Sequence, residues 1–392
     1  MKKIIAGLVA IAAATGFAFA DINLSFYNKL YEEDALVDHY DDDGTGDSDT
    51  KTNVPGLKER MYAEVTSGKV DAMVKATVAL DDHDDKHFGL QGELNDWYIE
   101  FRPFSILAFG MHTGIFSDGS LLPVYDDNLY AGNIGSEGFT VSITPIEALR
   151  IGVTTPFSFD GDYSNGAVNY LNGNEDDGED ENFNIGVGAI FTHDLFEATL
   201  SIQDILDSDE RQIGAYLLAP GLFGVYEPLT VGAGFAHAWG YKGAFSDLIS
   251  VGHVEAGLGY ENLLSAWAAI EFEKFSLTAE VLYNLGGDDE WVKAMGYNPL
   301  TYDSEDGFFG YDFYTGASIS FGLVENLTAT VTGKVLLDTT SSSKGGAETM
   351  LFGEFAVDYD INDNNTIGAA FDLGTCDKDW AIAVPVYWKY HF

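Results

Sequence analysis

The last stretch of the chain, Trp380 to Phe392, reads WAIAVPVYWKYHF and carries the pattern that decides the fold. Apolar or aromatic residues occupy every second position: Trp380, Ile382, Val384, Val386, Trp388, Tyr390 and Phe392. Because side chains alternate between the two faces of a strand, this spacing predicts a β-strand with one uniformly apolar face. Pro385 cannot donate a hydrogen bond to a neighbouring strand, so we expect a bulge there.

The same two-residue period recurs in many segments of the chain. Apolar residues alternate with polar ones through residues 70–80, 266–273 and 327–337. Segments of about ten residues, apolar on one face and polar on the other, are what a membrane-spanning β-barrel requires. No helical period of comparable length occurs, and no stretch after residue 20 is long and apolar enough for a spanning helix. The chain is therefore expected to be all-β, as a membrane barrel or as a soluble sheet protein.

The aromatic end of the chain resembles a known signal. Trp388, Tyr390 and Phe392 match the C-terminal assembly signal of bacterial outer-membrane β-barrels, closely over about the last ten residues and elsewhere through the repeated architecture. The resemblance implies an antiparallel transmembrane barrel of the porin type in the outer membrane. It also implies two partners: outer-membrane lipid, and the barrel-assembly machinery that reads these three residues.

An N-terminal targeting segment fits the same destination. Lys2 and Lys3 precede an apolar stretch that is too short to span a membrane, and Ala18-Phe19-Ala20 gives the small-x-small pattern of a cleavage site. We therefore predict a signal peptide over residues 1–20 and a single barrel domain over residues 21–392.

The composition is strongly acidic and excludes several classes of protein. The chain has 63 Asp and Glu against 19 Lys and Arg, and removal of Lys2 and Lys3 leaves a mature net charge of −46. Nucleic-acid binding needs a basic face, so it is excluded. An aromatic content of 14% argues against a disordered acidic chain. Cys376 is the single cysteine, so no intrachain disulfide can form.

Two kinds of connection alternate between the predicted strands. Short ones, such as 102–104 and 145–147, should be periplasmic turns, and long acidic ones, such as 32–56 and 158–181, should be extracellular loops. With both ends periplasmic the strand number must be even, so the direct count of about nineteen needs correction. Treating residues 240–262 as one outer excursion gives about eighteen strands, with about sixteen as the alternative if 196–205 is not a strand.

A barrel of this width encloses an aqueous channel, lined by the polar positions of its strands. The candidate channel-lining residues carry both charges: Arg60, Glu64, Lys75, Asp96, Glu100, Arg102, Arg150, Glu271, Glu273, Glu280 and Glu354. Arg60, Arg102 and Arg150 facing acidic residues could set a transverse field at a constriction. The alternative is that all of these are solvated lumen residues without a special role.

One loop should narrow a channel of this width. Residues 116–135 are the candidate, because the run from Leu121 to Tyr125 is too apolar for an exposed loop tip. The alternative is that this run packs against the barrel rim or a neighbouring subunit.

These features favour a porin, a channel for passive diffusion of small hydrophilic solutes. The sequence has only four arginines, and anion-selective pores use rings of Arg or Lys, so a preference for cations is expected. A substrate-specific channel and a surface adhesin on a barrel scaffold are the alternatives. The chain carries no recognised catalytic motif, so no enzymatic activity is expected.

The acidic loops raise the question of bound calcium. Asp41, Asp43 and Asp47 lie close together around Gly44 and Gly46, a density of oxygen ligands that suits Ca²⁺. Their spacing does not match the helix-flanked calcium loop, and a solvated, repelling outer surface is the other interpretation. No further cofactor is expected. A homotrimer, the pore radius and the identity of the permeating solute are left open.

Overall fold

The computed structural model describes the strands and the short turns of the chain. The described residues are 23–31, 35–40, 49–51, 57–66, 69–82, 88–111, 138–156, 185–203, 205–206, 211–239, 243–251, 254–260, 262–285, 312–337, 349–376 and 379–391. Residues 1–20, Asp41, Asp43, Asp47, the loop 116–135 and Phe392 lie outside them. The predictions of a signal peptide, a calcium site and an inward-folded loop at 116–135 therefore stay predictions.

The described chain is almost entirely β-strand. Its first half contains β1 (Asn23–Tyr31), β2 (Ala35–Tyr40), β3 (Asp49–Lys51), β4 (Leu57–Thr66), β5 (Val70–Asp82), β6 (Phe88–Phe104), β7 (Leu107–Met111), β8 (Gly138–Ile146), β9 (Leu149–Pro156), β10 (Gly186–His193), β11 (Phe196–Gln203) and β12 (Gln212–Ala219). Its second half contains the short turn α3 (Gly221–Gly224) and β13 (Leu229–Ala238), β14 (Gly243–Val251), β15 (Val254–Tyr260), β16 (Asn262–Phe272), β17 (Phe275–Asn284), β18 (Phe313–Val324), β19 (Leu327–Leu337), β20 (Thr349–Asn362), β21 (Asn365–Cys376), β22 (Asp379–Ala383) and β23 (Val386–His391). Among the described residues, no helix is long and apolar enough to cross a membrane.

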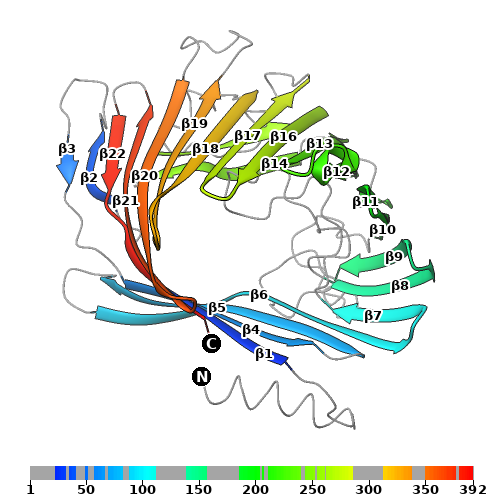
Figure 1. Ribbon diagram of the computed structural model, residues 1–392. Helices are drawn as coiled ribbons and strands as arrows, with labels where there is room; N and C mark the ends of the chain where they lie inside the picture. The colour runs from blue at the N-terminus through cyan, green and yellow to red at the C-terminus, as the bar shows by residue number, and fades with distance from the viewer. Residues whose placement is uncertain are drawn as a thin grey trace, which may run out of the picture.

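Neighbouring strands pair antiparallel, and the ladder returns to its first strand. β1 pairs with β4 on one side and with β23 on the other, so the two ends of the chain meet at one seam. Figure 1 shows the strands following one another around a curved wall, with the blue N-terminal strands next to the red C-terminal ones. Such a ladder gives every central strand two hydrogen-bonded neighbours, which is what a barrel needs in lipid.

The main sheet contains 21 described strands, some of which are consecutive pieces of one longer strand. β22 and β23 are one such pair, because both pair with β21. β1 with β2 and β3 with β4 are the other two, because β2 pairs with β22 and β3 as β1 pairs with β23 and β4. Three fewer than 21 leaves eighteen barrel strands in the described chain. The prediction of about eighteen is confirmed, and the alternative of sixteen is wrong because residues 196–203 form β11 between β10 and β12.

The interruption at Pro385 is a break rather than a bulge. β22 ends at Ala383 and β23 begins at Val386, yet both pieces pair with β21 in one unshifted register. The Pro385 carbonyl accepts a hydrogen bond from the Ala370 amide at 2.9 Å. Pro385 therefore removes a donor from the ladder without moving the aromatic face that follows it.

The two faces of each strand differ in polarity, as the alternation predicts. On β19, Val331 is largely exposed on the outer face, while Thr330 and Thr332 lie on the inner face. Their hydroxyls pair with those of Ser320 at 2.9 Å and Ser318 at 3.1 Å on β18. Exposed apolar side chains on the outer face and bonded hydroxyls on the inner face match a wall between lipid and an aqueous lumen.

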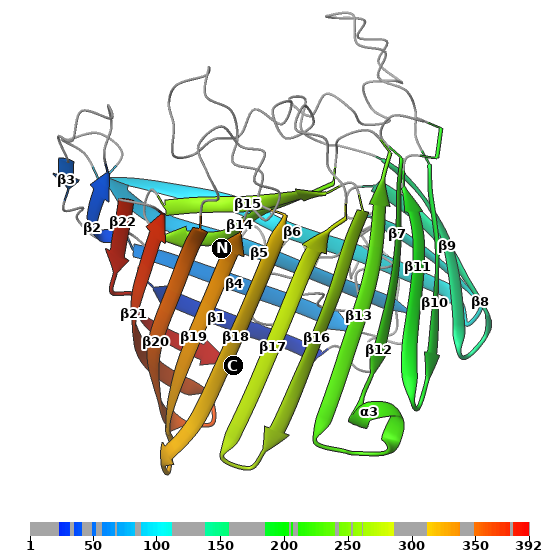
Figure 2. The same ribbon diagram turned by 90° about the horizontal axis from the view of Figure 1, so that it is seen from above.

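The excursion predicted between residues 240 and 262 is also confirmed. β13 pairs directly with β16, so the chain between them leaves the barrel and returns. Within it, β14 and β15 form a separate two-stranded sheet. Figure 2 shows this hairpin at the end of the wall away from the short turns, which include α3. Each short connection predicted near residues 103, 146, 195, 227, 274 and 325 has a turn in the structure, but residues 102–104 end β6 and the turn there is at 105–106.

Candidate functional site

Two arginines from different strands converge on one buried carboxylate. Glu100 of β6 is 3% exposed, accepts a hydrogen bond from Arg102 Nε at 2.6 Å and binds an Arg150 guanidinium nitrogen. Arg150 Nε donates to Ser142 Oγ at 3.1 Å, which holds the guanidinium plane in place. Asp71 extends the cluster, with its carboxylate 3.8 Å from Arg102. Hydrogen bonds between ionised partners are roughly twice as strong as neutral ones, so this cluster is a rigid part of the wall.

Small residues between the two arginines make the convergence possible. Glu100 is on β6 and Arg150 is on β9, so β7 and β8 separate them. The inner positions of β7 are Ala108 and Gly110, both buried, and Ser142 is the inner residue of β8 next to Ala108. An arginine side chain can therefore cross two strands along the wall and reach the carboxylate.

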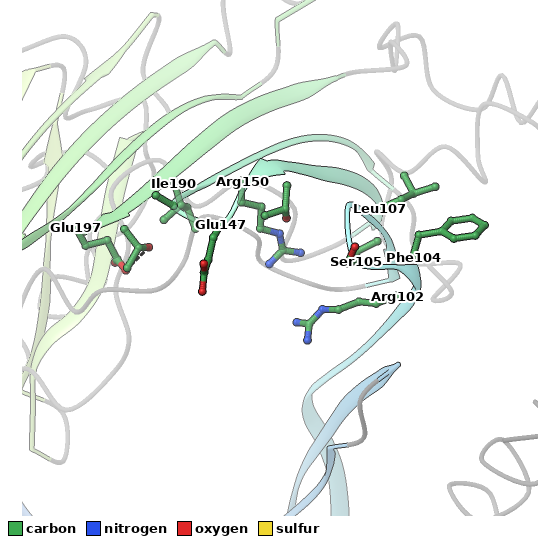
Figure 3. A pocket seen from close by; sticks show the side chains of 12 residues that line it. Arg102, Phe104, Ser105, Leu107, Glu147, Arg150, Ile190 and Glu197 are labelled. Atoms are coloured by element: carbon green, nitrogen blue, oxygen red, sulfur yellow. Dashed lines mark hydrogen bonds between the residues drawn. The ribbon is translucent and has the colours of Figure 1, made fainter. Parts of the chain in front are cut away.

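A hollow of about 290 Å³ lies beside this cluster, at the end of the wall that carries the short turns. Its lining includes Arg102, Arg150, Glu147, Thr192 and Glu197. Figure 3 shows the guanidinium groups of Arg102 and Arg150 and the carboxylate of Glu147 reaching into the same space. The hollow thus offers both charge signs to a polar solute.

The opposite part of the wall carries an excess of acids. Glu280 of β17 is 3% exposed and accepts a hydrogen bond from the Tyr314 hydroxyl at 2.6 Å. Glu354 of β20 accepts one from Thr332 at 3.2 Å and is the register partner of Asp372 on β21. Within the described part of the chain, the buried Oδ1 of Asp372 has no hydrogen-bond partner. This side of the wall therefore carries two neighbouring carboxylates, with Lys334 as a nearby cation.

Asp358 extends the acidic side along β20. It accepts a hydrogen bond from the Tyr387 hydroxyl at 2.7 Å, and Lys389 Nζ lies 3.9 Å from its carboxylate. The Lys389 ammonium also lies 4.7 Å from the centre of the Tyr387 ring. This acid is therefore partly compensated by Lys389.

The two charged regions lie across the lumen from each other. β9 and β20 are nine strands apart in either direction around the eighteen-strand ladder. Arg150 and Glu354 therefore lie on opposite sides of the barrel. Arg150 lies near the turn end of β9 and Glu354 in the middle of β20, so the field between them has a component across the lumen.

The structure places the predicted lining residues in three groups. Glu100, Arg102 and Arg150 form one cluster on the same wall, whereas the sequence led us to expect arginines facing acids across the lumen. Glu280 and Glu354 take inner positions on the opposite side, and Glu271 and Glu273 are exposed at the turn end of β16. The remaining four take strand positions whose side chains are outside the description: Arg60, Glu64, Lys75 and Asp96.

Several polar partners were not among the predicted site residues. Ser142, Tyr314, Tyr387 and Lys389 each contact a charged member of the site. The alternation in the last strand does place Tyr387 and Lys389 on the face opposite Trp388. That signal could have identified them. For Ser142 and Tyr314 the strand pairing was needed.

Arg150→Met should lower the free energy of unfolding by about 1.5–3 kcal/mol, since it removes charge-assisted hydrogen bonds from a buried carboxylate. Arg150→Lys should cost less, because the ammonium keeps the charge but cannot bond Glu100 and Ser142 in the same fork. Urea unfolding in lipid vesicles measures both variants. Equal losses would show that the geometry of the guanidinium does not matter.

The comparisons with known proteins address the fold. No family model matches the sequence, and no curated protein matches it. Three solved structures are similar: OpdK of Pseudomonas aeruginosa with vanillate, OccK8 (OprE) of Pseudomonas aeruginosa, and OccAB4 of Acinetobacter baumannii. The identities are 12%, 11% and 9%, and the TM-scores 0.54, 0.52 and 0.53. The matches cover 95%, 95% and 96% of this chain and 98%, 98% and 100% of those chains.

The likeness defines a class of fold. The chain has the β-barrel fold of outer-membrane porins along nearly its whole length. The prediction of a transmembrane barrel of the porin type is therefore confirmed at the level of the fold, and a soluble sheet protein is not supported.

Proposed function

We propose that this chain forms a water-filled channel through the bacterial outer membrane, which small hydrophilic solutes cross by passive diffusion. The observation that best supports this proposal is the ladder of eighteen described strands, which is apolar outside and polar inside. Barrels of sixteen to eighteen strands leave an aqueous channel, whereas about eight strands are filled by side chains. Lipid would contact the outer face. Assembly through Trp388, Tyr390 and Phe392 and a homotrimeric state stay predictions.

A preference for cations follows from the balance of charges on the described wall. Arg102 and Arg150 both bind Glu100, which cancels part of their charge. On the other side, Glu354 and Asp372 are adjacent in register. The acidic composition of the chain adds to this side of the balance, because a negative lining and mouth concentrate cations.

A substrate-specific channel is the second candidate, favoured by the hollow beside Arg102 and Arg150. Guanidinium groups bind carboxylates in a bidentate manner, so the hollow fits a small solute with one carboxylate. The similar OpdK structure is described with vanillate, which has that chemistry. No specific observation favours an adhesin.

Single-channel recording in a planar bilayer tests the proposal. The refolded protein should give open-state steps, and a salt gradient should give a reversal potential of the cation-selective sign. Insertion without steps would overturn the channel proposal, and an anion-selective sign would overturn the charge argument. Benzoate, added as a test solute, distinguishes the general diffusion channel from the substrate-specific channel. Saturable block of the current, weakened in Arg150→Met, would favour the specific channel, whereas a linear response would favour general diffusion.

A further inference from the structure

The hairpin formed by β14 and β15 lies against the inner face of the barrel. It leaves the wall after β13 and returns at β16, yet it contacts β20, β21 and β22, which are remote from both in the ladder. A segment that leaves one side of a barrel and touches the inner residues of strands beyond its neighbours must enter the lumen. Figure 1 shows β14 inside the curved wall.

The contact between hairpin and wall is a small hydrophobic core. On the hairpin, Leu248, Ile249, Val251, Val254 and Leu258 are at most 5% exposed. These side chains are too apolar to be held in water, and their burial shows which face of the hairpin meets the wall.

The wall beneath the hairpin is apolar at positions that should face water. Leu282, Tyr314, Leu336 and Met350 belong to this core and are fully buried, although they share the inner face of their strands with polar residues such as Glu280 and Thr332. They lie near the strand ends that lead into the long connections. These apolar side chains of the inner wall therefore form one core with the hairpin.

A glycine on β21 allows the hairpin to approach the wall closely. A Cβ atom at Gly374 would lie 3.1 Å from Val251 Cβ and 3.2 Å from Val254 Cγ1. Contacts at this distance are tighter than ordinary packing, so a larger side chain would push the hairpin away from the wall. Ala381 and Ala383 of β22 also belong to the core, and their small side chains leave room for the hairpin beside the wall.

We propose that this hairpin is a fixed constriction, which narrows the loop end of the lumen and sets the size limit for solutes. The proposal rests on the channel function proposed above and adds the element that filters by size. Solutes pass between the exposed face of the hairpin, on which Ser250 lies, and the uncovered strands of the opposite wall. Arg102 and Arg150, near the turn end, then act only on solutes that have passed this filter.

A designed disulfide tests whether the hairpin is packed against the inner wall. Val251→Cys with Gly374→Cys, in a Cys376→Ser background, places two Cβ atoms slightly closer than the usual 3.5–4.5 Å, so a small shift permits the bond. We expect the bond to form under mild oxidation and the conductance to be the same before and after reduction. A failure to crosslink would overturn the proposal that the hairpin packs against β21. A lower conductance in the oxidised state would show a mobile lid instead of a fixed constriction.

Gly374→Phe tests the filter itself, with Gly353→Phe on the outer face as the matched control. Displacement of the hairpin should shift the exclusion limit for polyethylene glycols to larger polymers and expose the buried Cys376 to a membrane-impermeant maleimide. The control should change neither. If Cys376 is labelled but the exclusion limit is unchanged, the hairpin does not set the size limit, although the proposed channel function is unaffected. Absence of any conductance in the unaltered protein would instead overturn the proposed function.

Discussion

Replacing Gly368 by valine should lower the free energy of unfolding of the barrel by about 1–3 kcal/mol, the usual cost of overpacking a filled site. Gly368 of β21 is the register partner of Tyr387 on β23, the strand that closes the barrel against β1. A Cβ atom at Gly368 would meet the ring of Tyr387, at Cε2 and Cζ. The ring covers the glycine on the inner face, and the space for a larger side chain is already occupied.

Displacement of that ring would cost more than packing. The Tyr387 hydroxyl would lose its hydrogen bond to Asp358, and Lys389 would lose the ring face over which it lies. Asp358 would then keep the Lys389 ammonium, 3.9 Å from its carboxylate. We therefore expect the variant to unfold at lower urea concentration in lipid vesicles.

Gly353→Val provides the matched control for Gly368→Val. Gly353 lies on the outer face of β20, and nothing lies within 4 Å of a Cβ atom placed there. Surface substitutions away from packed features usually change stability by less than about 0.5 kcal/mol, and a branched residue suits a strand better than glycine. Equal losses in the two variants would show that the fit between Gly368 and Tyr387 contributes nothing.

The same arrangement on the other side of the barrel suggests a general use of glycine. A Cβ atom at Gly232 of β13 would collide with the indole of Trp267 on β16, and Trp267 Nε1 donates to the Tyr216 hydroxyl at 3.1 Å. In both places an aromatic ring lies over a glycine on the neighbouring strand. Such pairs fix the register of two strands, because a one-residue slip would move the ring to the other face.

The strand pattern was predictable because lipid and water impose opposite polarity on alternate residues. That alternation placed Val331 outside and Thr332 inside, and an even strand number identified residues 240–262 as an excursion. That this excursion folds into the lumen was harder to predict. The hairpin packs on Leu282 and Leu336, which are apolar residues on the polar face of their strands. The sequence shows these two exceptions to the alternation, but only the strand pairing shows that they lie close together.

The charged cluster shows a different limit. Glu100 and Arg150 are 50 residues apart, and their contact depends on the small Ala108 and Gly110 between them. The sequence gives the charges but not which of them cancel. We expected Arg102 and Arg150 to face acidic residues, and strand pairing was needed to identify Glu100 of the same wall as one of them.

Neutralising Glu354, Asp358 and Asp372 together, as Gln, Asn and Asn, should abolish the preference for cations at low salt. These acids lie on β20 and β21, half the ladder away from Arg150. With them removed, Glu280 and the arginine-bound Glu100 remain on the inner face beside Arg102, Arg150 and Lys334, so the negative charge of the acidic side is much reduced. The reversal potential under a salt gradient should therefore move toward the anion-selective sign.

Salt dependence and a control with the same change in net charge separate position from total charge. The effect should shrink as salt rises, because the screening length falls from about 10 Å at 0.1 M to about 3 Å at 1 M. The control neutralises Glu227, Glu273 and Glu325, which are exposed at the short turns. If selectivity depends on the lumen wall, the control leaves the reversal potential nearly unchanged. Equal shifts in the two triple variants would mean that total charge governs selectivity, and the opposed walls would then have no part in it.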